Sequence, residues 1–368
     1  MPIPSASRFV LAAPLGFALA CSLSALAVEP DRLIADSRKM TPNPPWAAAD
    51  ERGMANQIGA GTYARCSWHM TRPQARTYEL SYVRSNTAPK SPFAGADTLN
   101  YSPTSGIPGT QHGFNTESHV DKADPAQQGT QFDALGHFAA LKSPWDGKAA
   151  FPSADLVYYG GLPQKEVKPS DGSPLLKLGM DKVPPIVTSA VVLDAKAFVG
   201  KGTALKAGDV VTAQHIDGML RAQGLAKRGI LPGDVVYVRT GWGDRWADPD
   251  TEKVYYAMAP GLSADAAKYL GEKRIVAVGL DAPFVDSLAE GFLQGKAGPA
   301  PGALENLPFS AHHVLLTQHG VHLIENANLA ALANDKTWTA CTMILPLRTQ
   351  GGAGSGVRPV AIGAPGQK

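Results

Sequence analysis

Charged residues are scarce in this sequence of 368 residues, at 18% of the chain, and the formal net charge is only +2. No run of Lys and Arg occurs, so the sequence lacks the concentrated basic surface that phosphate backbones require. After the N-terminal segment, no stretch is long and apolar enough to span a bilayer. We therefore expect a globular protein that binds neither nucleic acid nor, once that segment is removed, a membrane.

Several common catalytic motifs are also missing. The chain has no G-x-S-x-G, no H-E-x-x-H, no C-x-x-C and no phosphate-cradling loop of the Walker type. Each of these patterns carries a particular chemistry, so serine-triad, zincin, thioredoxin-like and nucleotide-binding functions lack support.

Cysteine is rare, with three residues in the chain. Cys21 lies in the N-terminal segment, which leaves Cys66 and Cys341 in the rest of the protein. These two either form one disulfide, if the compartment is oxidising, or remain two separate buried thiols. The sequence does not fix the distance between them and leaves both readings open.

The first residues have the features of a secretory signal. Arg8 is the only charge before the apolar stretch of residues 9–20, and small residues follow at positions 24–27. This pattern predicts a signal peptide over residues 1–27, with Ala27 the last residue removed, and a periplasmic or secreted protein. The alternative is a membrane anchor extended to Val28, against which Pro14 and the small-residue site argue.

Hydrophobic patterning predicts an α/β fold. β-Branched runs at 187–193, 235–240 and 275–280 indicate buried strands, and helical spacing at 212–223 and 263–270 indicates helices between them. Strands that alternate with helices are typical of α/β proteins. No linker or internal repeat interrupts the pattern, so we expect one domain.

Two segments are predicted to be irregular. Residues 28–44 are polar and rich in proline, and we expect an irregular lead-in there. Residues 86–128 hold many Gly, Pro, Ser, Thr and Asn, which predicts a long surface loop. A short strand is expected before that loop, over residues 78–83.

Two clusters could carry chemistry. Asp133 and His137 are four residues apart, and a carboxylate beside an imidazole is half of a divalent metal site, although this spacing more often gives an ion pair. Four histidines, a type used for metal binding and proton transfer, lie within eleven residues, at positions 312, 313, 319 and 322. Some of these are structural: His319 precedes a glycine at a turn, and on a strand His322 would face away from Glu325.

These segments together resemble the metal-dependent cyclase family, which includes bacterial kynurenine formamidases and isatin hydrolases. Residues 127–137 match the family's H-x-G-T-H-x-D-x-P-x-H motif, and residues 233–242 match its G-D-x-x-x-x-R-T-G-W segment. His313 and Glu325 have the separation of a further family pair, a His twelve residues before a Glu. The resemblance covers residues 45–363 and implies a central mixed β-barrel-like sheet flanked by helices.

The sequence departs from the family motif at three positions. Gln127 and Gln131 stand where the formamidases have His, and Leu135 stands where they have Pro. G-T-Q-x-D is the version of one branch of the family. The resemblance carries over one set of metal ligands, which consists of Asp133, His137, His313 and Glu325. Because glutamine is a poor substitute for imidazole at a zinc ion, we expect one divalent metal, zinc or manganese, with Gln127 and Gln131 binding substrate or a metal water.

Such a site implies hydrolysis of a carbonyl C–N or C–O bond in a small molecule, such as a formamide, cyclic amide or lactone, by a metal-activated water. His137, Glu325 and His312 are the candidate general bases, and the sequence does not choose among them. Phe132 and Trp242 either wall the substrate pocket or are core aromatics. The alternatives are a cyclase or dehydratase of the same family and a non-catalytic periplasmic ligand-binding protein. The resemblance also implies a homo-oligomer.

Overall fold

The structure is a computed structural model that describes residues 30–93, 97–121 and 128–367. The predicted signal peptide, residues 1–27, and Gln127 lie outside these residues. Among the described helices, none has the length and apolar character needed to cross a membrane.

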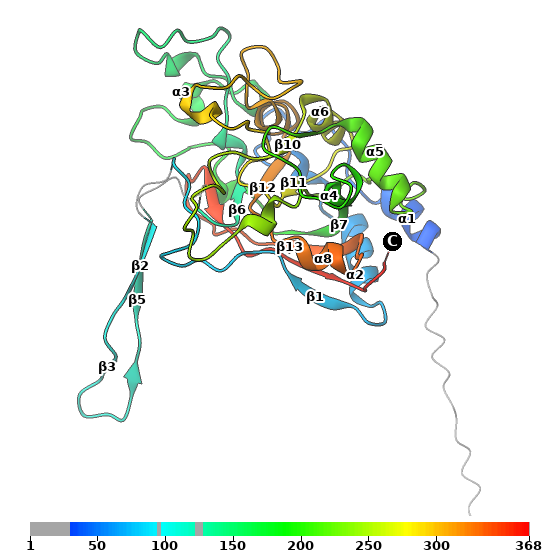
Figure 1. Cartoon of the computed structure of the whole chain (residues 1–368), viewed down its shortest axis with the longest axis horizontal. Coiled ribbons are helices and arrows are strands. Elements are labelled where there is room, and N and C mark those ends of the chain that lie inside the picture. Colours follow the sequence, from blue (N-terminus) through cyan, green and yellow to red (C-terminus); the bar gives the residue numbers. More distant parts are fainter. Residues whose placement is uncertain (1–29, 94–96, 122–127, 368) are drawn as a thin grey trace, which may run out of the picture.

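A nine-stranded sheet forms the centre of the molecule and curls into a half-barrel (Figure 1). Its strands, in spatial order, are β1 (Arg76–Glu79), β15 (Val360–Gly363), β13 (Thr339–Ile344), β7 (Ile186–Asp194), β9 (Val235–Arg239), β11 (Ala277–Leu280), β12 (His322–Glu325), β6 (Gln131–Asp133) and β14 (Gly354–Gly356). The four middle strands, β7, β9, β11 and β12, are parallel, and the outer pairs are antiparallel. The sheet is therefore mixed, as predicted.

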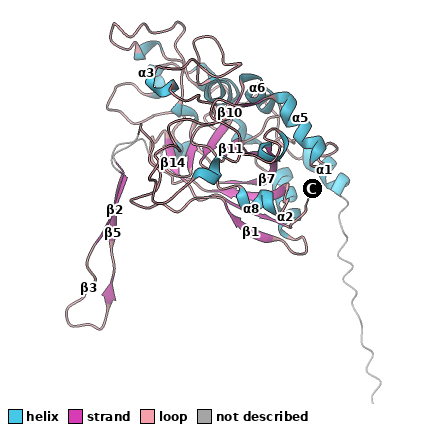
Figure 2. Cartoon of the chain, in the orientation of Figure 1, coloured by secondary structure: helices cyan, strands magenta, loops and turns pink. Residues whose placement is uncertain are grey.

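Helices flank this sheet (Figure 2). They are α1 (Pro30–Lys39), α2 (Ala60–Met70), α3 (Gln164–Val167), α4 (Ala195–Phe198), α5 (Ala213–Ala222), α6 (Ala264–Glu272), α7 (Ser310–His312), α8 (Ala330–Asn334) and a π-helix, η9 (His313–His319). The 3₁₀ turns are η1 (Gly53–Gln57), η3 (Leu135–His137), η4 (Ser153–Asp155), η5 (Tyr159–Gly161), η6 (Met180–Lys182), η7 (Trp242–Arg245) and η8 (Phe292–Gln294). A two-stranded parallel pair, β8 (Val210–Val211) with β10 (Gly261–Leu262), lies outside the main sheet.

The predicted strands and helices are confirmed where the hydrophobic pattern was strongest. The runs at 187–193, 235–240 and 275–280 are β7, β9 and β11, and all residues of β9 and β11 are buried. Parallel strands covered on both faces are continuous apolar runs, which is why the sequence identified them. The two predicted helices are α5 and α6, and each begins at a hydroxyl N-cap, Thr212 and Ser263.

The N-terminal lead-in differs from the prediction, because residues 30–39 form helix α1. Pro30 occupies the first helical position, where its missing N–H costs nothing, and Asp31 lies in the first turn with Arg38 and Lys39 in the last. The prolines on which the prediction of irregular chain rested lie at positions 42, 44 and 45, after the helix ends.

The segment 86–128 also differs from a simple loop. Within it, β2 (Asp97–Tyr101) pairs with β5 (Glu117–Asp121), and β3 (Ser105–Gly106) pairs with β4 (Gly113–Phe114). The result is a two-stranded ribbon that projects from the body of the molecule (Figure 1). Gly, Pro and Ser are disfavoured in strands. Two backbone segments can still pair through hydrogen bonds when few of their side chains are buried, as in this ribbon.

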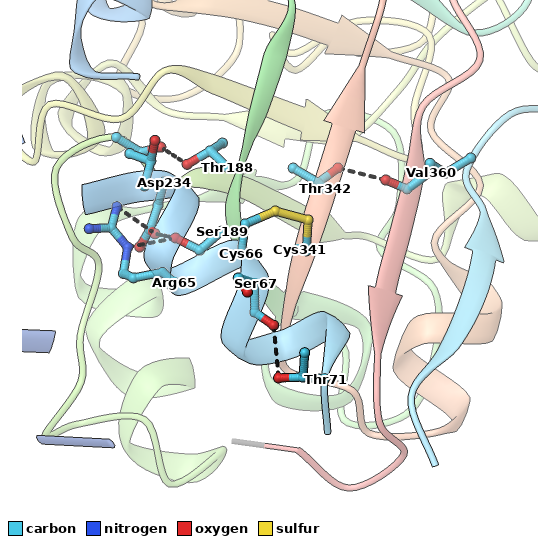
Figure 3. The surroundings of a disulfide bond; sticks show 12 residues. Arg65, Cys66, Ser67, Thr71, Thr188, Ser189, Asp234, Cys341, Thr342 and Val360 are labelled. Atoms are coloured by element: carbon cyan, nitrogen blue, oxygen red, sulfur yellow. Dashed lines mark hydrogen bonds and ion pairs between the residues drawn. A yellow bond between two sulfur atoms is a disulfide. The ribbon is translucent and has the colours of Figure 1, made fainter. Parts of the chain in front are cut away.

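The structure joins Cys66 on α2 to Cys341 on β13 as a disulfide (Figure 3). Beside it, Arg65 donates from Nε to the Ser189 hydroxyl at 2.8 Å, and Ser189 donates to buried Asp234 at 2.5 Å. The disulfide and this hydrogen-bond chain fasten α2 to the sheet at β7 and β13. Of the two readings that the sequence left open, the structure has the disulfide.

Candidate active site

The candidate site begins at the pair of antiparallel strands β6 and β12. Their register places Gln131 opposite Glu325, and directly opposite residues project from the same face of a sheet. Asp133 lies two residues along β6 and therefore projects from that face as well. All three side chains are buried. The strand pairing thus brings two carboxylates together that are 192 residues apart in sequence.

Two histidines complete the group. His137 ends η3, the turn that follows β6, and His312 ends the short helix α7. One ligand atom each of Asp133, His137 and His312 lie within 4.8 Å of one another. His312 Nε2 is 3.9 Å from Asp133 Oδ2 and 3.5 Å from Glu325 Oε1. The two sequence clusters therefore meet at one place.

Asp286 fixes the orientation of His312. Its carboxylate accepts the backbone N–H groups of Ala311 at 2.6 Å and His312 at 3.1 Å, and it lies 2.5 Å from His312 Nδ1. An ionised carboxylate only accepts, so Nδ1 donates to Asp286 and Nε2 faces Asp133 and Glu325. Burial alone would lower the pKa of His312, but the hydrogen bond and charge of Asp286 raise it above its ordinary value.

The sequence reasoning missed Asp286. It is 26 residues from His312 in the chain, and no motif spacing joins the two. It lies outside the two histidine and aspartate clusters and outside the segments matched to the family. Only the packing of α7 against the loop after β11 brings this carboxylate to the imidazole.

The side-chain amide of Gln131 contacts the carboxylates of Asp133 and Glu325. Its Nε2 donates to Glu325 Oε2 at 2.7 Å and lies 3.4 Å from Asp133 Oδ1, while its Oε1 is buried without a hydrogen-bond partner in the structure. Glu325 Oε1 also accepts the backbone N–H of Val285 at 2.9 Å. Burial nevertheless raises the pKa of Glu325 to about 7, against the opposing charge of His312 and these hydrogen bonds.

The structure does not place His313 with this group. His313 is half-buried, and its Nε2 lies 3.1 Å from the side-chain amide nitrogen of Gln318 on the same helix. The adjacent residue, His312, takes the position beside Asp133 that the family spacing gave to His313. The group of residues that could hold a metal in this structure contains His312 and not His313.

The π-helix η9 lies between the site histidine and the strand that carries Glu325. It spans His313–His319, between His312 and β12, and a π turn holds one residue more than an α turn. His312 lies thirteen residues before Glu325, one more than the family spacing, which agrees with the extra residue of a π turn.

Phe132 and Trp242, for which a pocket wall and a core position were both open, lie in the core. Phe132 is fully buried and its ring packs against His322, with ring centres 4.9 Å apart. Trp242 is 1% exposed, and its indole N–H donates to the carbonyl of Tyr255. The aromatic side chain next to the imidazole of His312 is instead Phe138, with ring centres 4.9 Å apart.

His322 and His319 are structural, as the sequence indicated. His322 is buried and its Nδ1 lies 3.0 Å from the carbonyl oxygen of Asp133, so it supports the backbone of β6. Burial, the largest influence, lowers the pKa of His322 to about 4 and keeps its ring neutral. His319 packs its ring against Gly271 of α6, where a β-carbon would not fit.

The donor set fits a divalent transition metal. Asp133 supplies a carboxylate oxygen and His137 and His312 supply imidazole nitrogens, which is the mixed set that zinc and manganese accept. The support of His312 by Asp286 is the carboxylate–histidine arrangement that orients imidazoles toward metals. The residues present therefore agree with a metal site.

Comparison with known proteins agrees with the fold and the motifs. The sequence profile of the Cyclase family matches residues 40–287. No protein with a curated description matches the sequence.

Solved structures share the fold. One is a novel cyclase, 22% identical, with a TM-score of 0.69 over 88% of this chain and 98% of that one. Isatin hydrolase A from Ralstonia solanacearum is 20% identical, with a TM-score of 0.52 over 78% of this chain and 92% of that one. Isatin hydrolase A from Labrenzia aggregata, bound to benzyl benzoate, is 18% identical, with a TM-score of 0.52 over 79% of this chain and 94% of that one. Since the family profile covers more than half of its length, the chain belongs to the Cyclase family.

Proposed function

We propose that this protein is a metal-dependent hydrolase that cleaves a carbonyl C–N or C–O bond in a small molecule. The observation that carries the proposal is the convergence of Asp133, His137 and His312 within 4.8 Å, with Glu325 beside them. The substrate classes are formamides, cyclic amides and lactones, with a kynurenine-type formamide as one member. Membership in the Cyclase family and the shared fold with two isatin hydrolases support this assignment.

Asp133, His137 and His312 would hold one divalent ion, zinc or manganese. When bound, such an ion activates a water molecule at neutral pH and polarises a carbonyl oxygen. Gln131 supports a single ion rather than two, because its amide nitrogen faces both carboxylates and donates to Glu325. A donor N–H group at that position occupies space that a second cation would need and offers it no lone pair.

Glu325 is the residue best placed to move the proton. Its carboxylate lies 3.5 Å from His312 Nε2 and is held by Gln131 and the N–H of Val285, so it is fixed beside the metal-binding atoms. In hydrolysis, the water oxygen bonds to the carbonyl carbon, Glu325 takes the water's proton, and the C–N or C–O bond breaks. Glu325 then returns that proton to the departing nitrogen or oxygen, so the residue ends unchanged.

His312 is less suited to that role. Its Nδ1 is bonded to Asp286 and its Nε2 faces the ligand group, so both nitrogens are engaged once an ion is held. Of the three candidate bases from the sequence, Glu325 is therefore our proposal, with His137 and His312 as ligands.

The test is the metal content of the purified protein without an affinity tag, measured by elemental mass spectrometry. We expect about one zinc or manganese ion per chain in the wild type, as a site with one full set of ligands holds. Asp133→Ala and His312→Ala lose the metal, and His313→Ala, the matched neighbour, retains it. If His312→Ala retained the metal and His313→Ala lost it, the assignment of His312 as a metal ligand would be wrong.

Activity separates the proposed hydrolase from its alternatives. The metal-loaded wild type is screened against formamides, imides and lactones, and Glu325→Gln is expected to lower kcat by about 10²–10⁴-fold. Gln131 in place of a histidine, donating to a carboxylate, is the observation that favours a non-catalytic ligand-binding protein. If the wild type takes up no metal after reconstitution, the metal-dependent hydrolase mechanism is wrong and the ligand-binding protein remains as the alternative. A cyclase or dehydratase would instead release water from an open-chain substrate.

A further inference from the structure

A hollow of 160 Å³ lies between α1, α2 and the turn that follows α5, and we call it the α1 hollow. Its apolar wall is formed by Leu33 and Ile34 of α1, Trp68 of α2, and Leu225. The described residues that line it include none of the candidate active site. The α1 hollow is therefore a separate place on the molecule, and nothing in the proposed hydrolysis uses it.

Two buried polar residues, His69 and Thr339, also line the α1 hollow. His69 lies three residues after Cys66 on α2, and residues three apart project from one face of a helix. Thr339 lies two residues before Cys341 on β13, and residues two apart project from one face of a strand. The disulfide between Cys66 and Cys341 (Figure 3) therefore also sets His69 and Thr339 on the two sides of one interface.

Gln367 fixes the tautomer of His69. Its Oε1 accepts the backbone N–H of Ala364 at 3.0 Å, so its Nε2 is the atom that lies 2.8 Å from His69 Nδ1 and donates to it. Burial, the largest influence, and the positive charge of Arg228 lower the pKa of His69 to about 3, so the ring is neutral. A neutral ring that accepts at Nδ1 carries its proton at Nε2. Within residues 30–93, 97–121 and 128–367, this N–H has no hydrogen-bond acceptor.

Thr339 offers a second unpaired group. Its side chain is fully buried, and its Oγ1 has no hydrogen-bond partner in the part of the chain that the structure describes. Buried polar groups are nearly always hydrogen-bonded, and each exception calls for an explanation. An N–H group and a hydroxyl that line the same hollow are explained together by a ligand oxygen that accepts from His69 and bonds to Thr339.

The charged residues at the α1 hollow are already paired within the chain. Lys227 pairs with Asp31, and both are exposed at its rim. Arg228 donates to the two carboxylate oxygens of Asp234 at 2.6 and 3.0 Å. No lining cation that the structure describes is left to neutralise an anion, and burial of an uncompensated charge is costly. The ligand that fits is therefore uncharged.

The size of the α1 hollow limits the ligand to one ring. A protein cavity of about 150 Å³ with an apolar lining holds one benzene molecule. The α1 hollow has a similar volume and an apolar wall, and its two unpaired polar groups add a place for one oxygen atom.

We propose that the α1 hollow binds an uncharged phenol. The ring of this ligand packs on Ile34, Trp68 and Leu225. Its hydroxyl oxygen accepts the N–H of His69, and its hydroxyl proton is donated to Thr339 Oγ1. The proposal does not depend on the metal site or on hydrolysis.

The test is isothermal titration calorimetry of the full chain with phenol, benzene and benzoate. Phenol is expected to bind saturably, at one molecule per chain. Benzene fills the same space without an oxygen, so we expect it to bind about tenfold more weakly, as the loss of hydrogen bonds to buried groups predicts. Benzoate carries a charge that nothing in the hollow neutralises, and it is expected not to displace phenol. The proposal is wrong if phenol does not bind saturably at millimolar concentration or if benzoate displaces it.

Variants connect the binding to the α1 hollow. Ile34→Trp fills it and is expected to abolish phenol binding. Leu176→Trp, at an exposed position outside the hollow, is the matched control and should bind phenol as the wild type does. His69→Phe keeps a ring of similar size but removes the N–H, so the affinity for phenol should fall about tenfold while the affinity for benzene is retained.

His312→Ala separates the α1 hollow from the candidate active site, because this variant should bind phenol with wild-type affinity. Circular dichroism of every variant excludes misfolding as the cause of a lost heat of binding. Phenol binding that Ile34→Trp and His69→Phe leave unchanged, or that His312→Ala abolishes, would overturn the proposal.

Discussion

At the scale of single residues, His312 and Asp286 act as one unit. Three contacts join Asp286 to the end of α7, two from backbone N–H groups and one from the imidazole. The backbone contacts fix the position of the short helix α7, and the contact with Nδ1 fixes the orientation of the His312 ring. Because the same carboxylate does both, the position of His312 depends on a residue outside the group that would bind metal.

Asp286→Asn tests this positioning role. The asparagine keeps the size of the side chain but removes the charge that favours Nδ1–H, so His312 loses its fixed tautomer and orientation. We expect metal affinity to fall by about 10–100-fold while the fold is retained. Competition with a chelating dye measures the affinity, and Asp265→Asn, a conservative change at the start of α6, is the control. Equal affinities in Asp286→Asn and wild type would show that Asp286 serves only the backbone.

At the scale of elements, the π-helix η9 and the disulfide have the largest consequences. The π-helix begins directly after His312, the one of two adjacent histidines that lies beside Asp133. Such insertions are frequent at functional sites, where one residue re-aims a side chain. The disulfide joins α2 to β13 across 275 residues of chain, so it restricts the unfolded chain strongly.

Removal of the disulfide tests its contribution to stability. The double variant Cys66→Ser/Cys341→Ser is expected to lose about 2–5 kcal/mol of unfolding free energy, since a large loop is no longer closed in the unfolded chain. Chemical denaturation with and without reductant measures the loss. The wild type should respond to reductant and the double variant should not. A wild type whose stability is the same under both conditions would contradict the disulfide.

At the scale of the whole molecule, the disulfide also bears on the compartment. Disulfides persist in oxidising compartments, which agrees with the proposal that the protein is exported to the periplasm or secreted. Residues 1–27, which carry the predicted signal, lie outside the described part of the chain, so the support comes from Cys66 and Cys341 alone.

Export can be tested on the mature protein. We expect the protein purified from the periplasm or medium to begin at Val28, because a signal peptidase cleaves after the small residue Ala27. Intact-mass spectrometry of the purified chain gives the N-terminus directly. Ala27→Leu, which blocks the cleavage position, should retain the uncleaved chain. A wild-type protein that still carries residues 1–27 would favour the alternative of a membrane anchor.

The sequence by itself determined the class of the fold and named most residues of the candidate site. The buried parallel strands β7, β9 and β11 were readable because strands covered on both faces must be apolar throughout. Asp133, His137 and Glu325 could be predicted because the family motif fixes them within short, regular segments, and the structure brings them together. The choice of one metal also came from the sequence, through Gln131, and it stays a prediction, as does the G-T-Q-x-D branch.

Tertiary structure decided the rest. The pairing of β6 with β12 joined Gln131 to Glu325, and the position of α7 placed His312 rather than His313 beside Asp133. The structure places Phe132 and Trp242 in the core, one of the two positions left open for them, and β2 pairs with β5 in a segment whose composition predicted a loop. In each case the determining contact is between residues distant in the chain or depends on one turn of helix. Periodicity and spacing report only on neighbours in sequence, and for this reason they could not supply these contacts.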